Sequence, residues 1–286
     1  MRSMLATVRL ENWSDAHRLA TWVARWVFRG HASARWELET ALERACRDGR
    51  VATKHISNRE FWMLRQFQRR AHIVVNQPPE LTATLDWLAL IQHYGGPTRL
   101  LDFTYSLYVA AFFAIEFATE DAAIWAINLQ ALDQANDEAI GSNETIDHMN
   151  RRYIETLQKC VSDGSPNAGV IYAEPDRLNE RMAAQQGIFL FPKDAALPFM
   201  INLRAAMGES ATNNRSSSLT VAELNKVLFT DTSPNVIKFV LPRDIHDNIM
   251  DDLVQMNIAA HTLFPGLDGF ARSLHRHARF FRWGRE

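Results

Sequence analysis

Residues 105–119 (YSLYVAAFFAIEFAT) restrict the fold strongly, because a helix over this range is apolar on nearly every side. Such a helix is stable only when other structure covers it completely. Its start is marked by Thr104 or Ser106, whose hydroxyls can accept hydrogen bonds from the first free backbone amides. An apolar content of 47% is that of a folded globular protein and can supply such a covering.

Two more helices are expected before this segment. Residues 57–75 open with a Ser-x-x-Glu capping box and carry apolar side chains at helical spacing. Residues 82–94 end at a glycine pair followed by a proline, which is the usual stop of a helix. His93 and Tyr94 would therefore lie in the last turn of the second helix.

Runs of β-branched and aromatic residues predict strands at residues 24–31, 122–129, 168–174, 187–192 and 235–242, and residues 97–103 should be extended. Polar stretches at 133–150 and 208–219 predict loops, and further helices are predicted from a capping box at 220–223 and from periodic residues at 244–258. We expect one α+β domain over residues 1–286, with a central mixed or antiparallel sheet flanked by helices. Helices would dominate from about 32 to 120, strands from about 121 to 242, and helices again from 243 to 286.

The charge and the cysteine content exclude several classes of protein. With 31 basic and 33 acidic residues the chain has a net charge of −2, so any attraction for anions must be local. Its two cysteines are far apart and its ten histidines are scattered, which argues against a disulfide framework and against a metal site. Without an apolar leader or a run of 18 apolar residues, we expect a cytoplasmic protein with no membrane partner.

A cluster of polar side chains between the two apolar segments is the main candidate site. Its members are Gln92, His93, Tyr94, Thr98, Arg99, Asp102 and Thr104. Each buried polar group left unpaired would cost roughly 1–3 kcal/mol, so these groups must bond either to one another or to a ligand. One interpretation is a structural network in which Arg99 bridges to Asp102. We favour a cleft, because free amides at 104–107 would bind an anion at the start of the next helix.

Arg29 is a second candidate, because it lies near the end of the predicted strand 24–31. Gly30 and His31 follow it, and the glycine would let a ligand approach the backbone closely. Taken alone, the pattern also fits an arginine paired with a buried carboxylate. The C-terminal residues 272–286 interleave basic residues with Phe280, Phe281 and Trp283, which fits a docked amphipathic helix first and a nucleic-acid contact second.

With these residues the chain resembles the FRG domain, a family named for a Phe-Arg-Gly motif that is seen here at residues 28–30. The resemblance continues at 92–114, 181–191 and 262–274. FRG domains often occur in bacterial conflict and anti-phage loci. The family therefore implies a toxin-like protein, with an antitoxin or chaperone as a further partner.

A more distant similarity is to ADP-ribosyltransferases. In that comparison Arg29 matches the arginine that holds the NAD phosphates, residues 104–106 match the strand that orders the pocket, and residues 184–191 (AQQGIFLF) match the strand of the catalytic glutamate. This chain departs from the pattern there, because it has Gln185 and Gln186 where the glutamate is expected. A neutral amide can bond to a ribose hydroxyl but supplies no charge.

The similarity implies an ADP-ribosyltransferase-like core that cleaves NAD, its substrate, and transfers ADP-ribose to a nucleic acid or a protein. The residues assigned to the chemistry are Arg29, His93, Tyr94, Asp102 and Gln185. Those assigned to NAD binding are Arg29, Gly30, His31, Gln92, Thr98, Arg99, Thr104 and Ser106. In this scheme Arg29 and Arg99 hold the pyrophosphate, while Asp102 acts as electrostatic partner or base.

Two other functions stay open. The missing glutamate favours a non-catalytic module that senses a nucleotide or nucleic acid and docks a partner. A metal-independent nuclease or phosphoesterase would use His93 and Arg99, although no second acid or base stands at a readable spacing.

Overall fold

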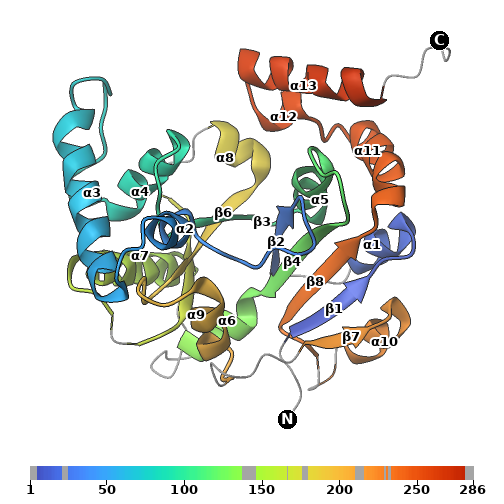
Figure 1. Cartoon of the computed structure of the whole chain (residues 1–286), viewed down its shortest axis with the longest axis horizontal. Coiled ribbons are helices and arrows are strands. Elements are labelled where there is room, and N and C mark those ends of the chain that lie inside the picture. The colour runs from blue at the N-terminus through green and yellow to red at the C-terminus, as the bar shows by residue number, and fades with distance from the viewer. Residues whose placement is uncertain are drawn as a thin grey trace.

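The computed structural model describes residues 5–20, 25–136, 146–165, 167–175, 180–209, 216–228, 230 and 233–280. In this part of the chain one mixed sheet has the strand order β5-β6-β3-β2-β4-β8-β1-β7 (Figure 1). The strands are β1 (Leu5–Arg9), β2 (Trp26–His31), β3 (Leu101–Thr104), β4 (Ala122–Asn128), β5 (Val170–Ala173), β6 (Gly187–Pro192), β7 (Ser217–Leu219) and β8 (Val236–Leu241). Strand β1 runs parallel to β7 and β8, and the other pairs are antiparallel. The α+β class with a mixed sheet is thus confirmed.

Helices cover both faces of the sheet. They are α1 (Trp13–Ala20), α2 (Ala41–Asp48), α3 (Ile56–Ala71), α4 (Thr84–His93), α5 (Leu107–Ile115), α6 (Leu129–Asn136), α7 (Ile146–Ser162), α8 (Glu180–Gln185), α9 (Phe199–Ala206), α10 (Val221–Val227), α11 (His246–Gln255), α12 (Ala260–Leu263) and α13 (Leu267–Phe280). On one face α5 and α11 share a core with β2 and β4, and α3, α4 and α7 share another with β5 and β6. On the opposite face α9 packs against the sheet. No helix of the described residues is long and apolar enough to cross a membrane.

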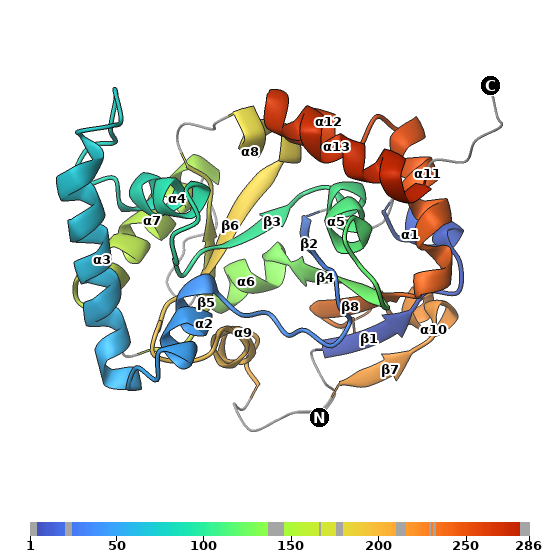
Figure 2. The ribbon, with the colours of Figure 1, turned by 45° about the horizontal axis from the view of Figure 1, so that its top comes forward.

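Helix α5 is buried as expected and lies between the sheet and the last helices (Figures 1 and 2). Ser106 is its N-cap, and its side chain accepts a hydrogen bond from the backbone N of Val109 at 3.2 Å. The other end of the preceding loop follows the sequence pattern too. Gly95 takes a positive φ of 81°, and the backbone N of Gly96 bonds to the carbonyl of Ile91 at 2.8 Å, which closes α4.

The predicted strands at 24–31, 122–129, 168–174, 187–192 and 235–242 are all present, as is the capping box of α10. The loop predictions were wrong in part. Helix α7 begins at Ile146 inside the expected loop 133–150, whose residues 137–145 lie outside the described part. Strand β7 occupies the end of the expected loop 208–219, whose residues 210–215 are likewise not described. Both elements are polar on their outer side, which is why composition alone indicated loops.

The sheet separates between β2 and β3, and this separation positions the site. The two strands pair only at Phe28 and Thr104, whereas β2 pairs with β4 along its whole length and β3 pairs with β6 along its whole length. Beyond that single pair the residues after Phe28 and those before Thr104 are not joined by the ladder. Side chains, rather than backbone bonds, therefore fill the space between Arg29 and Asp102.

Candidate functional site

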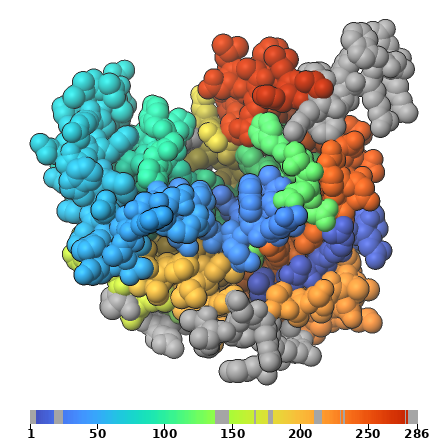
Figure 3. All heavy atoms as spheres, viewed as in Figure 1, coloured from blue at the N-terminus to red at the C-terminus, as the bar shows by residue number. Residues whose placement is uncertain are grey.

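A cleft of about 1360 Å³ opens where β2 and β3 separate. Figure 3 shows the surface hollowed between the red C-terminal helices and the blue segment around α2. Its lining comes from β2 and the following loop, α2, α4, β3, α8, α9 and the α12–α13 region. Pockets for small ligands usually measure about 300–1,000 Å³, so the cleft is large enough for a dinucleotide.

The lining is positively charged, in contrast to the chain as a whole. Seven arginines and four carboxylates line the cleft: Arg29, Arg35, Arg44, Arg47, Arg181, Arg204 and Arg272, with Glu37, Glu39, Glu43 and Asp102. The whole chain carries a net charge of −2, so this excess of positive charge is a local property of the cleft. A concave wall lined with one sign of charge attracts the opposite sign, which here is an anion.

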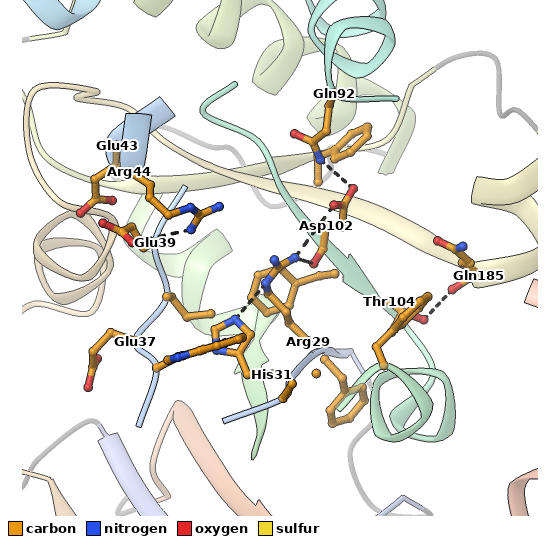
Figure 4. A pocket seen from close by; sticks show the side chains of 18 of the residues that line it. Arg29, His31, Glu37, Glu39, Glu43, Arg44, Gln92, Asp102, Thr104 and Gln185 are labelled. Atoms are coloured by element: carbon orange, nitrogen blue, oxygen red, sulfur yellow. Dashed lines mark hydrogen bonds and ion pairs between the residues drawn. The ribbon is translucent and has the colours of Figure 1, made fainter. Parts of the chain in front are cut away.

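Arg29 lies at the centre of the cleft, between His31 and Asp102 (Figure 4). Its Nη1 donates to the backbone carbonyl of Asp102 at 2.6 Å, and its Nε donates to Nε2 of His31 at 3.2 Å. Its Nη1 also lies 4.0 Å from the carboxylate oxygen Oδ2 of Asp102. Burial lowers the pKa of Arg29, while Asp102 raises it and Arg44 lowers it further. The guanidinium is thus fixed in place, and the carboxylate of Asp102 is at ion-pair distance but not in hydrogen-bond contact, so Arg29 can still meet an anion.

His31 orients Arg29 in its neutral form. Burial and the charge of Arg29 lower the pKa of His31 to about 3. Because its Nε2 accepts the hydrogen bond from Arg29, the ring proton must reside on Nδ1. At neutral pH the imidazole therefore adds no charge to the cleft, and it holds the guanidinium by accepting a hydrogen bond from it.

Asp102 projects from β3 into the cleft with its side chain 66% exposed. Its Oδ1 accepts a hydrogen bond from Nε2 of Gln92 at 2.8 Å, and Oε1 of Gln92 accepts from the hydroxyl of Thr98. Thr98 itself is fully buried and does not line the cleft. Thr98 and Gln92 therefore position Asp102, and of the three Gln92 and Asp102 are accessible to a ligand.

The other predicted residues of this stretch divide into two groups. His93 lines the cleft, whereas Tyr94 does not and is 68% exposed. Thr104 lines the cleft, but its hydroxyl donates to the carbonyl of Gln185 at 2.7 Å. Ser106 does not line it and caps α5.

The prediction that Arg99 binds the ligand was wrong. Arg99 is fully buried, and its Nε donates to both carboxylate oxygens of Glu60 at 2.8 and 3.0 Å. The remaining guanidinium nitrogens donate to backbone carbonyls, including that of Lys193 at 3.1 Å. All its hydrogen bonds are therefore made by the protein, and Arg99 joins α3 to the end of β6. The proposed bridge from Arg99 to Asp102 is absent from the described interactions for the same reason.

Gly30 lines the cleft and also has a packing role. A Cβ at this position would lie 2.1 Å from the carbonyl oxygen of Ala110 and 2.5 Å from the backbone N of Ala114. The missing side chain thus lets α5 pack directly on β2. Gly30 contributes to the site because it fixes the strand that carries Arg29.

Gln185, in α8, lines the cleft on the side of Thr104 (Figure 4). Its Nε2 donates to the carbonyl of Leu263 at 3.0 Å and so joins α8 to α12. Its Oε1 has the capacity to accept a hydrogen bond from a ligand hydroxyl.

For the C-terminal residues the docked helix, which was the first interpretation, is present as far as the structure describes them. Residues 267–280 form α13, and Arg272 bonds to Glu116. The side chain of Phe280 and residues 281–286, with Phe281 and Trp283, lie outside the described part.

The cleft residues that sequence reasoning missed include Arg181, Arg272 and Trp36. The guanidinium carbons of Arg181 and Arg272 lie 4.5 and 4.0 Å from the ring centre of Phe264, so both cations stack on one aromatic ring. Both lie within the segments 181–191 and 262–274 that carried the family resemblance. Trp36 stands in the polar run HASARWELE, where a lone tryptophan was the available signal.

Among known protein families, the model of the FRG domain matches residues 24–123 of the chain. The match confirms the resemblance to the FRG domain over this part of the chain. The matched range holds β2 with Arg29, the polar residues 92–104 and α5, and it covers about a third of the chain. No curated protein and no solved structure matches the chain significantly.

The FRG domain therefore supplies one side of the cleft, and later segments supply the other. Arg181, Gln185 and Arg272 all lie beyond the matched residues. Within the described residues no group of three or more His, Cys, Asp or Glu side chains could hold a metal ion. The side chains that the cleft offers to a ligand include guanidinium groups, the exposed carboxylates of Glu37 and Asp102, and amides. This set suits the binding of a phosphate-bearing ligand.

Proposed function

We propose that the cleft binds NAD and that the protein transfers ADP-ribose to a macromolecular acceptor, either nucleic acid or protein. On this proposal the activity is that of a toxin of bacterial conflict that acts in the cytoplasm, and an antitoxin or chaperone keeps it silent. Arg29 would bind the pyrophosphate, because it is the fixed guanidinium at the centre of the cleft.

One observation carries the proposal. The three segments that resemble ADP-ribosyltransferases are far apart in sequence. They lie in or next to the strands β2, β3 and β6, which are neighbours in the sheet. Arg29, Thr104 and Gln185 line the same cleft. Their convergence on one positively charged cavity of dinucleotide size supports the proposal.

The chemical step is cleavage of the bond between nicotinamide and ribose, which leaves a positively charged, oxocarbenium-like sugar carbon. A negative charge close to that carbon stabilises it. Of the four carboxylates in the lining, Asp102 is the one whose carbonyl and side chain face Arg29. Asp102 would thus supply the charge that Gln185 lacks, and Gln185 would accept a hydrogen bond from a ribose hydroxyl. His93 would line the nicotinamide end.

A second function is favoured by Gln185 itself. A neutral amide replaces the expected glutamate, and its Nε2 already bonds to Leu263. A cleft with this composition could bind NAD or another nucleotide without turnover and report its presence to a partner. Binding of NAD with no release of nicotinamide would select this function.

The test is to incubate the purified protein with NAD labelled in the adenylate, together with cell extract, and to measure nicotinamide release and label transfer. The wild type should release nicotinamide, and Arg29→Ala should lower the rate at least 100-fold, as expected when a charged contact to the transition state is lost. Arg70→Ala is the matched control, because Arg70 is exposed on α3 and does not line the cleft. Wild-type protein that releases no nicotinamide and labels no acceptor would contradict the proposal.

A further inference from the structure

Trp36 is an exposed aromatic residue inside the cleft. Two tryptophans in the described part of the chain are largely exposed, Trp36 at 56% and Trp62 at 62%, and of these Trp36 lines the cleft. Single exposed apolar side chains are common on protein surfaces. A tryptophan within a positively charged cleft is different, because its flat face can stack on a nucleobase whose phosphate binds nearby.

The protein holds Trp36 in place before any ligand binds. Nζ of Lys238 donates to its backbone carbonyl at 3.2 Å, and its backbone N donates to the carbonyl of Ser33 at 3.2 Å. Its ring meets His31 edge to face, with ring centres 6.0 Å apart and planes at 66°. Lys238 in turn lies over the ring of Trp125 at 4.8 Å, so the loop is tied to the sheet. A ring fixed in this way loses little entropy when a base stacks on it.

The position of Trp36 relative to Arg29 follows from their shared neighbour. The ring of His31 contacts Trp36, and its Nε2 accepts from Arg29, so His31 lies next to each of the two side chains. In a nucleotide one ribose separates the base from the phosphate. A base on Trp36 would therefore place its phosphate within reach of Arg29.

Asp102 lies on the other side of Arg29. The guanidinium is held between His31 at its Nε and the carbonyl of Asp102 at its Nη1 (Figure 4). NAD has its pyrophosphate in the middle and one base at each end. With the pyrophosphate at Arg29, an extended dinucleotide would have its two ends on opposite sides of the guanidinium.

We propose that Trp36 stacks on the adenine base of the dinucleotide. This inference rests on the proposed function and adds the orientation of the ligand. Adenine lies on the side of His31, and the nicotinamide riboside lies on the side of Asp102 and Gln185. Trp36 is then the residue that selects ligands carrying a purine, and it takes no part in the chemical step.

The test is calorimetric titration of NAD, AMP and nicotinamide mononucleotide into the wild type, Trp36→Ala and Trp36→Phe. Loss of a base–aromatic stack should weaken binding of NAD and AMP roughly 5- to 150-fold in Trp36→Ala. Trp36→Phe should retain most of the affinity. Nicotinamide mononucleotide, which lacks adenine, should bind all three proteins equally, and this equality also shows that the cleft is intact. Trp62→Ala is the matched control and should change nothing.

Three results would overturn the inference: unchanged affinity of Trp36→Ala for AMP, equal loss of affinity for nicotinamide mononucleotide, or a wild type that does not bind AMP. Failure of the proposed function gives a different result. Binding of AMP that depends on Trp36, with no release of nicotinamide from NAD, would contradict the transferase and support the stacking role. Trp36→Ala could also release nicotinamide at the wild-type rate at NAD concentrations below saturation. That result would support the transferase and contradict the stacking role.

Discussion

At the scale of single residues, two arginines with similar sequence surroundings have opposite roles. Arg29 has its nearest carboxylate oxygen at 4.0 Å and lines the cleft, whereas Arg99 is enclosed with Glu60. Both occur beside small or polar residues, and their local patterns did not separate them. Glu60 lies 39 positions before Arg99, on α3, and a pairing over that distance depends on tertiary packing that one sequence does not reveal.

Removal of Arg99 should affect stability rather than ligand binding. Arg99→Met leaves the carboxylate of Glu60 buried without its partner, which typically costs about 3–5 kcal/mol. Urea unfolding should show this loss, and a double variant with Glu60→Leu should recover most of it. The affinity of the folded protein for NAD should stay at the wild-type value. A stable Arg99→Met variant that fails to bind NAD would show that Arg99 contacts the ligand.

The pKa of His31 predicts a pH dependence of folding. Burial lowers this pKa from 6.5 to about 3, so between these values the unfolded chain binds a proton that the folded chain does not. The free energy of unfolding should therefore decrease as the pH falls from 7 towards 4. Urea midpoints for His31→Gln should fall less steeply over this range, although not to zero, since burial also lowers the pKa of His246. Equal slopes for the two proteins would contradict a neutral His31.

At the scale of elements, the sequence predicts the helices and strands whose ends and apolar pattern are set by residues close together in the chain. Helix α5 and the stop of α4 follow from a continuous apolar run and a Gly-Gly-Pro sequence. Strand β1 and helix α9 were not predicted from the sequence. The separation of β2 from β3 could not be predicted, because register between strands depends on the whole sheet.

The contact of β2 with α5 should tolerate no side chain at Gly30. The alanine Cβ would meet the carbonyl oxygen of Ala110 at 2.1 Å, so backbone must move, at a cost of roughly 1–3 kcal/mol or more. Thermal unfolding of Gly30→Ala should show a melting temperature several degrees below that of the wild type. Gly187→Ala is the control, since its nearest neighbour would be an ordinary contact at 3.5 Å. Equal melting temperatures for both variants would contradict the close packing.

At the scale of the whole molecule, the charge distribution matters more than the net charge. The chain carries −2 overall, while its cleft has three more arginines than carboxylates. Composition predicted that any anion site must be local, and it could not say where. The site depends on residues from β2 to α13 that lie up to 243 positions apart, which is the difference between Arg29 and Arg272.

Salt should therefore weaken the binding of charged ligands and leave neutral ones unaffected. The Debye length falls from about 10 Å at 0.1 M salt to about 3 Å at 1 M, so a cluster of guanidinium groups attracts an anion less. Titrations at 50 and 500 mM NaCl should show several-fold weaker binding of NAD at the higher salt. Adenosine, which has no phosphate, should bind equally at both concentrations. A salt-independent affinity for NAD would show that the arginines of the cleft do not contact its phosphates.

The central claim is that the cleft between β2 and β3 is a dinucleotide site with Arg29 at the pyrophosphate. A crystal structure with bound ADP-ribose measures this most directly. The pyrophosphate should accept hydrogen bonds from the guanidinium of Arg29, the adenine should lie on the ring of Trp36, and the terminal ribose should face Asp102 and Gln185. ADP-ribose bound elsewhere, or bound in the cleft with its pyrophosphate out of reach of Arg29, would contradict it.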